Sequence, residues 1–148
     1  MVDADMTGKT VLITGANSGI GYQTAAGLLR LGAQVVMVSR DPTRGEQTRS
    51  RLMEQTGSQR VHVFLGDLAS HESIRALAES FLQRAPRLEV IINNAGVIEP
   101  KRRLSANGIE MTLAVNLVAP FLLTNLLLER LTFYTSATQS PWPHHTPA

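Results

Sequence analysis

Three glycines near the start of the chain have the spacing of a phosphate-binding turn. Gly15, Gly19 and Gly21 fall between an apolar run, 10–14, and a segment with helical periodicity. Glycine permits a tight turn and a close approach of backbone to phosphate, and a helix N-terminus offers free N–H groups with a favourable dipole. An ordinary glycine-rich connection is the alternative, but the position between strand and helix favours a phosphate site. We therefore expect a nucleotide pyrophosphate at residues 15–21.

An arginine follows the second apolar run, where a dinucleotide fold places the adenosine ribose. Ser39 is neutral, and the planar guanidinium of Arg40 can bind a phosphate, with Arg44 adding charge. Asp41 precedes Pro42, which is typical of a helix N-cap rather than of a ribose ligand. The pattern favours NADP(H) over NAD(H), and NAD(H) remains the alternative.

A further polar residue, Asn116, lies inside a long apolar segment, four residues before Pro120. Proline has no N–H, so the carbonyl of Asn116 lacks its usual helical partner. This carbonyl must bond to water or to a side chain. A kink without catalytic purpose is the alternative interpretation.

The elements that must position these residues alternate regularly along the chain. Continuous apolar runs predict buried strands, and the segments between them predict helices. The strands are expected at 10–14, 35–38, 61–65 and 88–92, and the helices at 19–31, 42–56, after Ser70 and at 107–131. This alternation predicts an α/β, Rossmann-type, doubly wound parallel sheet with strand order 3-2-1-4.

Composition excludes several classes of function. The 148 residues suit one domain, and the absence of cysteine excludes disulfides and thiol catalysis. A net charge of +2 without a basic stripe argues against nucleic acid. The pair His144–His145 lies in a proline-rich stretch, so we expect no metal site. The polar segment Met1–Lys9 is unlike a secretory signal, and a cytoplasmic location is expected.

One uncharged segment, Met111–Leu128, is long enough to raise the question of a membrane. Asn116, Pro120, Thr124 and Asn125 interrupt it. A helix buried between a sheet and another helix is the better interpretation, and we expect no membrane partner.

The G-x-x-x-G-x-G spacing, together with Asn93-Asn94-Ala95-Gly96 after the fourth strand, resembles the short-chain dehydrogenase/reductase family over residues 7–131. Among its members, the chain is most similar to the retinol-dehydrogenase type. The resemblance implies that Asp67 and Leu68 hold the adenine, although Asp67 could instead cap a turn before Ser70. The cofactor-binding residues expected are Gly15, Asn17, Ser18, Gly19, Ile20, Gly21, Ser39, Arg40, Asp67, Leu68, Asn94, Ala95 and Gly96.

The resemblance also implies catalytic residues that this sequence lacks. The family uses a Ser, a Tyr and a Lys four residues after the Tyr, but the tyrosines here are Tyr22 and Tyr134, and residue 138 is Thr. Asn116, whose backbone carbonyl anchors a water in the family, is the only expected catalytic residue. The chain resembles a member cut short after its fifth helix, with an incomplete sheet and an irregular, disordered tail at 132–148. A reading-frame error is the leading hypothesis.

Residues 1–131 are thus expected to form the nicotinamide-dinucleotide-binding part of such an enzyme. The family transfers hydride between this cofactor and an alcohol or carbonyl substrate, and this chain alone is expected to have little or no activity. A non-catalytic binding module and a functionless product are the alternatives. Strand four and the last helix would be exposed and would favour self-association. The sequence does not identify the substrate. The loop 98–104 could border the substrate pocket or be a solvated loop.

Overall fold

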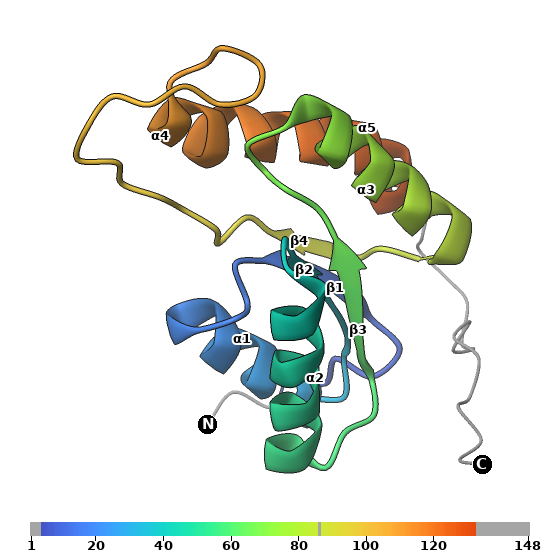
Figure 1. Ribbon diagram of the computed structural model, residues 1–148. Helices are drawn as coiled ribbons and strands as arrows, with labels where there is room; N and C mark the ends of the chain where they lie inside the picture. Colours follow the sequence, from blue (N-terminus) through green and yellow to red (C-terminus); the bar gives the residue numbers. More distant parts are fainter. Residues whose placement is uncertain (1–3, 86, 133–148) are drawn as a thin grey trace.

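A computed structural model describes residues 4–85 and 87–132 of the chain (Figure 1). A parallel sheet with strand order β3-β2-β1-β4 lies at its centre, as predicted. The elements in chain order are β1 (Thr10–Thr14), α1 (Gly19–Arg30), β2 (Gln34–Ser39), α2 (Pro42–Thr56), β3 (Val61–Leu65), α3 (His71–Arg84), β4 (Val90–Ile92), α4 (Met111–Leu113), a π-helical turn η1 (Ala114–Val118) and α5 (Ala119–Thr132).

Helices cover both faces of the sheet (Figure 1). Because successive side chains of a strand point to opposite faces, β1 contributes to two separate cores. Leu12 packs in the core on the side of α3 and α5, together with Phe64 and Leu123. Val11 and Ile13 pack in the other core, on the side of α1 and α2. All these side chains are buried, and the carboxyl ends of the strands are thereby fixed relative to one another.

The segment after β4 differs from the sequence prediction. A single helix was expected at 107–131, but the helix begins at Met111, and the residues before it form a turn closed by the Leu104–Glu110 bridge. Gly108 takes a positive φ of 73° in this turn. The Glu110 side chain then accepts hydrogen bonds from the backbone N–H groups of Thr112 and Leu113, which starts the helix. Strand β4 is also shorter than the predicted 88–92.

The predicted interruption near Asn116 takes the form of the π-helical turn η1. The Ala119 N–H donates to the carbonyl of Ala114, five residues earlier, rather than to that of Val115. Pro120 directly follows Ala119 and cannot donate to Asn116. A π-turn inserts one extra residue into the helix, and such turns occur frequently at functional sites.

The helical segment Met111–Leu131 is long and apolar enough, by length and composition, to cross a membrane, and its most apolar 18-residue stretch has a mean hydropathy of 1.8 and is 33% buried. One face carries Ala119, Leu123 and Leu127, which are buried in the core beside α3. The predicted packing against sheet and helix is therefore present on this face. The other face exposes large apolar side chains, including Leu117 and Phe121. The tail predicted at 132–148 lies outside the described residues, apart from Thr132, which ends α5.

Candidate functional site

Residues 15–21, the predicted phosphate turn, pack directly against the segment that follows β4; we call them the phosphate turn. Gly15 has a φ of 69°, and a Cβ atom built on it would lie 2.8 Å from the Cα atom of Ala95. A Cβ atom on Gly21 would collide with the Asn94 amide and with the Gly15 carbonyl. Glycine is therefore required at both positions, as the sequence predicted, because neither the backbone nor Asn94 leaves room for a side chain.

Asn94 and Thr14 hold this contact together. The Asn94 Nδ2 atom donates to the carbonyl oxygens of Thr14 and Gly15, each at 3.1 Å. The Ala95 N–H donates to the Thr14 hydroxyl at 3.0 Å. Thr14 was not singled out from the sequence, because a threonine in a buried strand looks like an ordinary strand residue. Its hydroxyl fixes the backbone of Ala95 beside the turn.

The outer part of the turn is open. Gly19 has a φ of 57° and no atom near the position of a Cβ, and Ser18 and Ile20 are exposed. The side chain of Ser18 makes no cap hydrogen bond, although Ser18 is the N-cap residue of α1. The first backbone N–H groups of α1 therefore lie beside open space, and this arrangement suits an anion.

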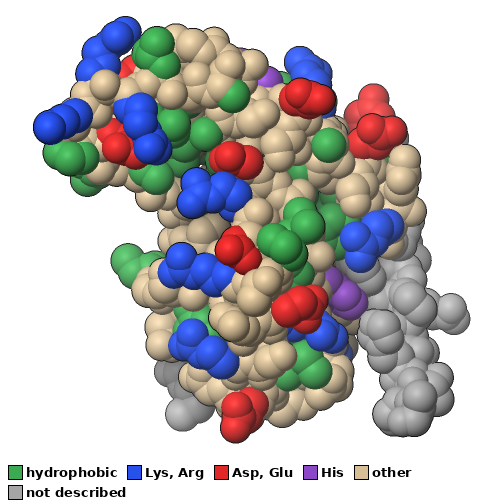
Figure 2. Space-filling model, viewed as in Figure 1, with side chains coloured by type: hydrophobic (Ala, Val, Ile, Leu, Met, Phe, Trp, Pro, Cys, Tyr) green, Lys and Arg blue, Asp and Glu red, His purple; other side chains and the backbone are tan. Residues whose placement is uncertain are grey.

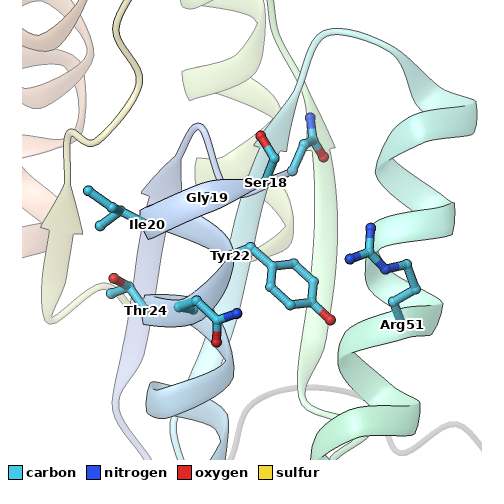
Figure 3. A pocket seen from close by; sticks show the side chains of 8 residues that line it. Ser18, Gly19, Ile20, Tyr22, Thr24 and Arg51 are labelled. Carbon is cyan, nitrogen blue, oxygen red and sulfur yellow. The ribbon is translucent and has the colours of Figure 1, made fainter.

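A hollow of about 740 Å³ lies on one side of this turn, between α1 and α2 (Figure 3). The guanidinium of Arg51 lies 4.8 Å from the ring centre of Tyr22. The Tyr22 hydroxyl donates to Gln55 at 2.7 Å. These contacts join the two helices, so we interpret the polar groups of this hollow as structural.

A larger cleft of about 890 Å³ opens on the other side of the turn, at the carboxyl ends of the strands. Figure 2 shows a hollow between the part of the molecule with α4 and the part with α1, with Lys and Arg side chains along it. The cleft brings together predicted cofactor residues from four separate segments. These are Gly15, Asn17, Ser18, Arg40, Asp67, Leu68, Asn94, Ala95 and Gly96.

Four predicted residues do not line this cleft. Gly19 and Ile20 border the hollow between α1 and α2 instead, and Gly21 lies beneath the turn. Ser39 is only 1% exposed, and its hydroxyl is bonded within the protein. Strand β2 runs one residue further than predicted, and this places Ser39 in the sheet.

The start of α2 places Arg40, Asp41 and Arg44 at one edge of the cleft. The Asp41 side chain accepts a hydrogen bond from the Arg44 N–H at 2.9 Å, which confirms its predicted role as N-cap. Arg40 and Arg44 are exposed, and both line the cleft. We call these two residues the arginine corner. Two guanidinium groups at one edge suit a phosphate better than a neutral hydroxyl.

The turn after β3 holds Asp67 in two ways. Asp67 Oδ1 accepts from the Ala69 N–H at 2.9 Å, and the Asp67 carbonyl accepts from the Ser70 N–H at 3.1 Å. The turn-capping alternative is thus present in the structure. Asp67 also lines the cleft, so its position is compatible with the predicted contact to adenine.

The loop between β4 and α4 borders the cleft on the side opposite the phosphate turn. Glu99, Arg103 and Leu104 line it, and the Arg103 guanidinium pairs with the Glu99 carboxylate at 2.9 Å. Lys101 and Arg102 are exposed and do not line the cleft. Part of the loop 98–104 thus borders this cleft and part of it does not, and its expected place beside a substrate pocket stays a prediction.

Asn116 is exposed and does not line the cleft. Its Oδ1 atom accepts from the Val97 N–H at 2.8 Å, and its Nδ2 atom donates to the Val97 carbonyl at 2.9 Å. Val97 and the neighbouring Val115 line the cleft. The sequence predicted that the Asn116 carbonyl lacks its usual helical partner. It did not predict that the Asn116 side chain pairs with the backbone of Val97.

The charged side chains that line the cleft are three arginines and three carboxylates, namely Arg40, Arg44, Arg103, Asp41, Asp67 and Glu99. The described residues contain no cluster of His, Cys, Asp or Glu that could hold a metal ion. Glu110, at the start of α4, is held as a carboxylate. The N–H groups of Thr112 and then Leu113 donate to it and lower its pKa below the ordinary glutamate value. The arrangement as a whole can bind an extended anion that carries more than one phosphate.

Comparison with known proteins agrees with this geometry. A family described as short chain dehydrogenase matches residues 9–138. Mouse retinol dehydrogenase 14 is 49% identical over 134 residues, which cover 83% of this chain and 40% of that protein. Bovine retinol dehydrogenase 12 is 46% identical over 129 residues, which cover 87% of this chain and 41% of that protein. The chain thus spans about 40% of the length of these relatives.

Solved structures share the fold. The RhlG/NADP active-site complex of Pseudomonas aeruginosa superposes with a TM-score of 0.76 at 30% identity, covering 91% of this chain and 51% of that one. A metagenomic short-chain oxidoreductase in complex with NADP gives a TM-score of 0.75 at 29% identity, covering 86% of this chain and 58% of that one. Both neighbours were solved with NADP bound.

Proposed function

This chain belongs to the short chain dehydrogenase family, and we propose that it binds NADP(H) in the cleft between the phosphate turn and the arginine corner. The observation that carries this proposal is the convergence of four segments on one cleft. The phosphate turn, the arginine corner, the turn after β3 and the segment Asn94–Gly96 all line it. A dinucleotide offers one chemical group to each of them.

The residues present fit such a ligand. The exposed backbone at Ser18 and Gly19 leaves N–H groups for the pyrophosphate. Arg40 and Arg44 supply positive charge where a 2′-phosphate would lie, and this supports NADP(H) over NAD(H). Asp67 and Leu68 would flank the adenine. The NADP in the two solved neighbours is consistent with this preference.

A bound nicotinamide dinucleotide would supply hydride transfer to or from an alcohol or carbonyl group. This chain contributes the backbone carbonyl of Asn116, which lacks an N–H partner at Pro120 and could hold a water. Its sequence offers no tyrosine with a lysine four residues later to move the proton. We therefore propose that the chain by itself binds cofactor and has little or no turnover.

A non-catalytic nucleotide-binding module is the second candidate function. It is favoured by the same two observations, an assembled cleft and no Tyr-x-x-x-Lys in the sequence. Under this proposal the chain would act through its nucleotide-bound form.

We also propose a cytoplasmic location.

Fluorescence titration with NADPH, followed by an activity assay with simple ketones and retinoids, tests both candidates. Binding without turnover would support the nucleotide site and the binding module. Turnover would contradict the proposal that the chain is inactive by itself. The absence of both binding and turnover would contradict the nucleotide site and would favour a functionless product.

A further inference from the structure

The Ser39 side chain links two parts of the cleft wall that lie far apart in the sequence. Its hydroxyl accepts a hydrogen bond from Nδ2 of Asn17 at 3.1 Å and donates to the Asp41 carbonyl at 2.8 Å. Asn17 belongs to the phosphate turn, and Asp41 directly follows Arg40 at the start of α2. One hydroxyl therefore connects the proposed pyrophosphate site with the arginine corner.

The link lies in a closely packed position. Ser39 is 1% exposed, and a Cβ atom on Gly45 would lie 3.1 Å from the Ser39 Cβ. The Ser39 carbonyl accepts from the Gly66 N–H at 3.0 Å, which ties the turn after β3 to the same point. The hydroxyl is thus closed off from solvent and from a ligand, so its effect on binding must act through its neighbours.

Asn17 depends on this hydroxyl more than Asp41 does. The Oδ1 atom of Asn17 is buried and has no hydrogen-bond partner among the described residues. The Asp41 carbonyl also accepts from the Gly45 N–H at 2.9 Å. Loss of the Ser39 hydroxyl would leave the whole Asn17 amide unpaired, which is unfavourable for a buried polar group. The Asn17 side chain would then reorient and release the turn from α2.

We propose that Ser39 is a positioning residue that raises the preference for a 2′-phosphorylated dinucleotide by holding the arginine corner at a fixed place relative to the phosphate turn. This inference rests on the proposed binding of NADP(H). A dinucleotide with a 2′-phosphate must reach both sites at once, whereas one without it needs only the turn. Preorganisation of the two sites therefore favours the phosphorylated ligand selectively.

The test compares calorimetric dissociation constants for NADPH and NADH in the full chain and in Ser39→Ala. The ratio of the NADH constant to the NADPH constant should fall about fivefold, which is the effect of one lost hydrogen bond. Asn17→Ala breaks the same hydrogen bond from the other side and should lower the ratio similarly. It replaces Ser39→Ala if that variant does not fold. Thr56→Val is the matched control, because it removes a hydroxyl bonded to the Leu52 carbonyl at the far end of α2.

A double-mutant cycle separates positioning from general damage. In a background that carries both Arg40→Ala and Arg44→Ala, Ser39→Ala should leave the ratio unchanged, because the groups it positions are absent. Equal weakening of NADPH and NADH binding by Ser39→Ala, or a change of the ratio that persists without Arg40 and Arg44, would overturn the inference alone. An unmodified chain that binds NADPH no better than NADH would instead overturn the proposed cofactor, and the inference with it.

Discussion

Asn116 and Val97 are joined by two hydrogen bonds, in which the side-chain amide of one residue pairs with both backbone groups of the other. Asn116 lies in the π-helical turn η1, and Val97 lies in the loop that leaves β4. The amide therefore fixes this loop against the helix. Because Val97 lines the cleft, the pair also fixes part of the proposed nicotinamide-dinucleotide site.

Asn116→Ala should lower the free energy of unfolding by about 1 kcal/mol, because two hydrogen bonds are lost at an exposed position. It should also weaken NADPH binding severalfold, since the loop is no longer fixed. Urea denaturation and calorimetry measure the two effects. Asn125→Ala is the control, because Asn125 donates to the Phe121 carbonyl on the same helix away from the cleft. Equal effects of both variants on NADPH binding would contradict this role for Asn116.

Gly21→Ala should destabilise the protein by about 1–3 kcal/mol, because a methyl group has to fit against Asn94 and the Gly15 carbonyl. NADPH binding should fall with it. Gly27 lies in the same helix, but a Cβ there would meet no other atom. Gly27→Ala should therefore stabilise the protein by about 0.5–1 kcal/mol. The urea midpoints of the two variants measure both effects. A Gly21→Ala variant as stable as the unmodified chain would contradict the close contact of Gly21 with Asn94 and Gly15.

Glu110 should make stability depend on pH. Its pKa is lowered in the folded state by the Thr112 and Leu113 N–H groups, so it stabilises the fold above the ordinary glutamate range. That contribution should be lost as the pH falls through the lowered value. The stability difference between the unmodified chain and Glu110→Gln, measured by urea denaturation, should shrink as the pH falls from neutral to below about 4. A constant difference across this range would show that the carboxylate has no such role.

The exposed face of the last helix should cause self-association. Leu117 is 62% exposed and Phe121 is 69% exposed, one turn apart. Strand β4 lies at an edge of the sheet within the described residues, and its apolar side chains are only partly covered. Light scattering should show a mass that rises with concentration, and Phe121→Lys should reduce the rise. Ile98→Lys, at an exposed position outside this helix, should not. A monodisperse monomer at high concentration would contradict the prediction.

The sequence predicted the parts of the site that depend on local patterns. The glycine spacing indicated where the turn packs, and Asp41-Pro42 indicated the start of α2. Both follow from a few neighbouring residues. The strand order was indicated by the alternation of apolar runs and helical segments along the chain. The strand order is confirmed. Arg40 and Asp67 line the cleft, and the roles expected of them stay predictions.

The features of the site that the sequence did not predict depend on contacts between distant segments. The burial of Ser39 follows from its packing against Gly45, and the use of Asn116 follows from the path of the loop to Val97. The start of the last helix was misplaced because Glu110 caps it with its own side chain, which helical periodicity does not reveal. The reading-frame hypothesis for 132–148 stays a prediction, and translation of the coding DNA in the other frames tests it.

The cleft is proposed to bind a dinucleotide, and the arginine corner is proposed to select the 2′-phosphorylated form. Titration of the full chain with NADPH and with NADH at one ionic strength, repeated with Arg40→Ala, tests it most directly. We predict that NADPH binds more tightly than NADH and that Arg40→Ala removes most of this difference. Tighter binding of NADH, or no binding of either nucleotide, would contradict the claim.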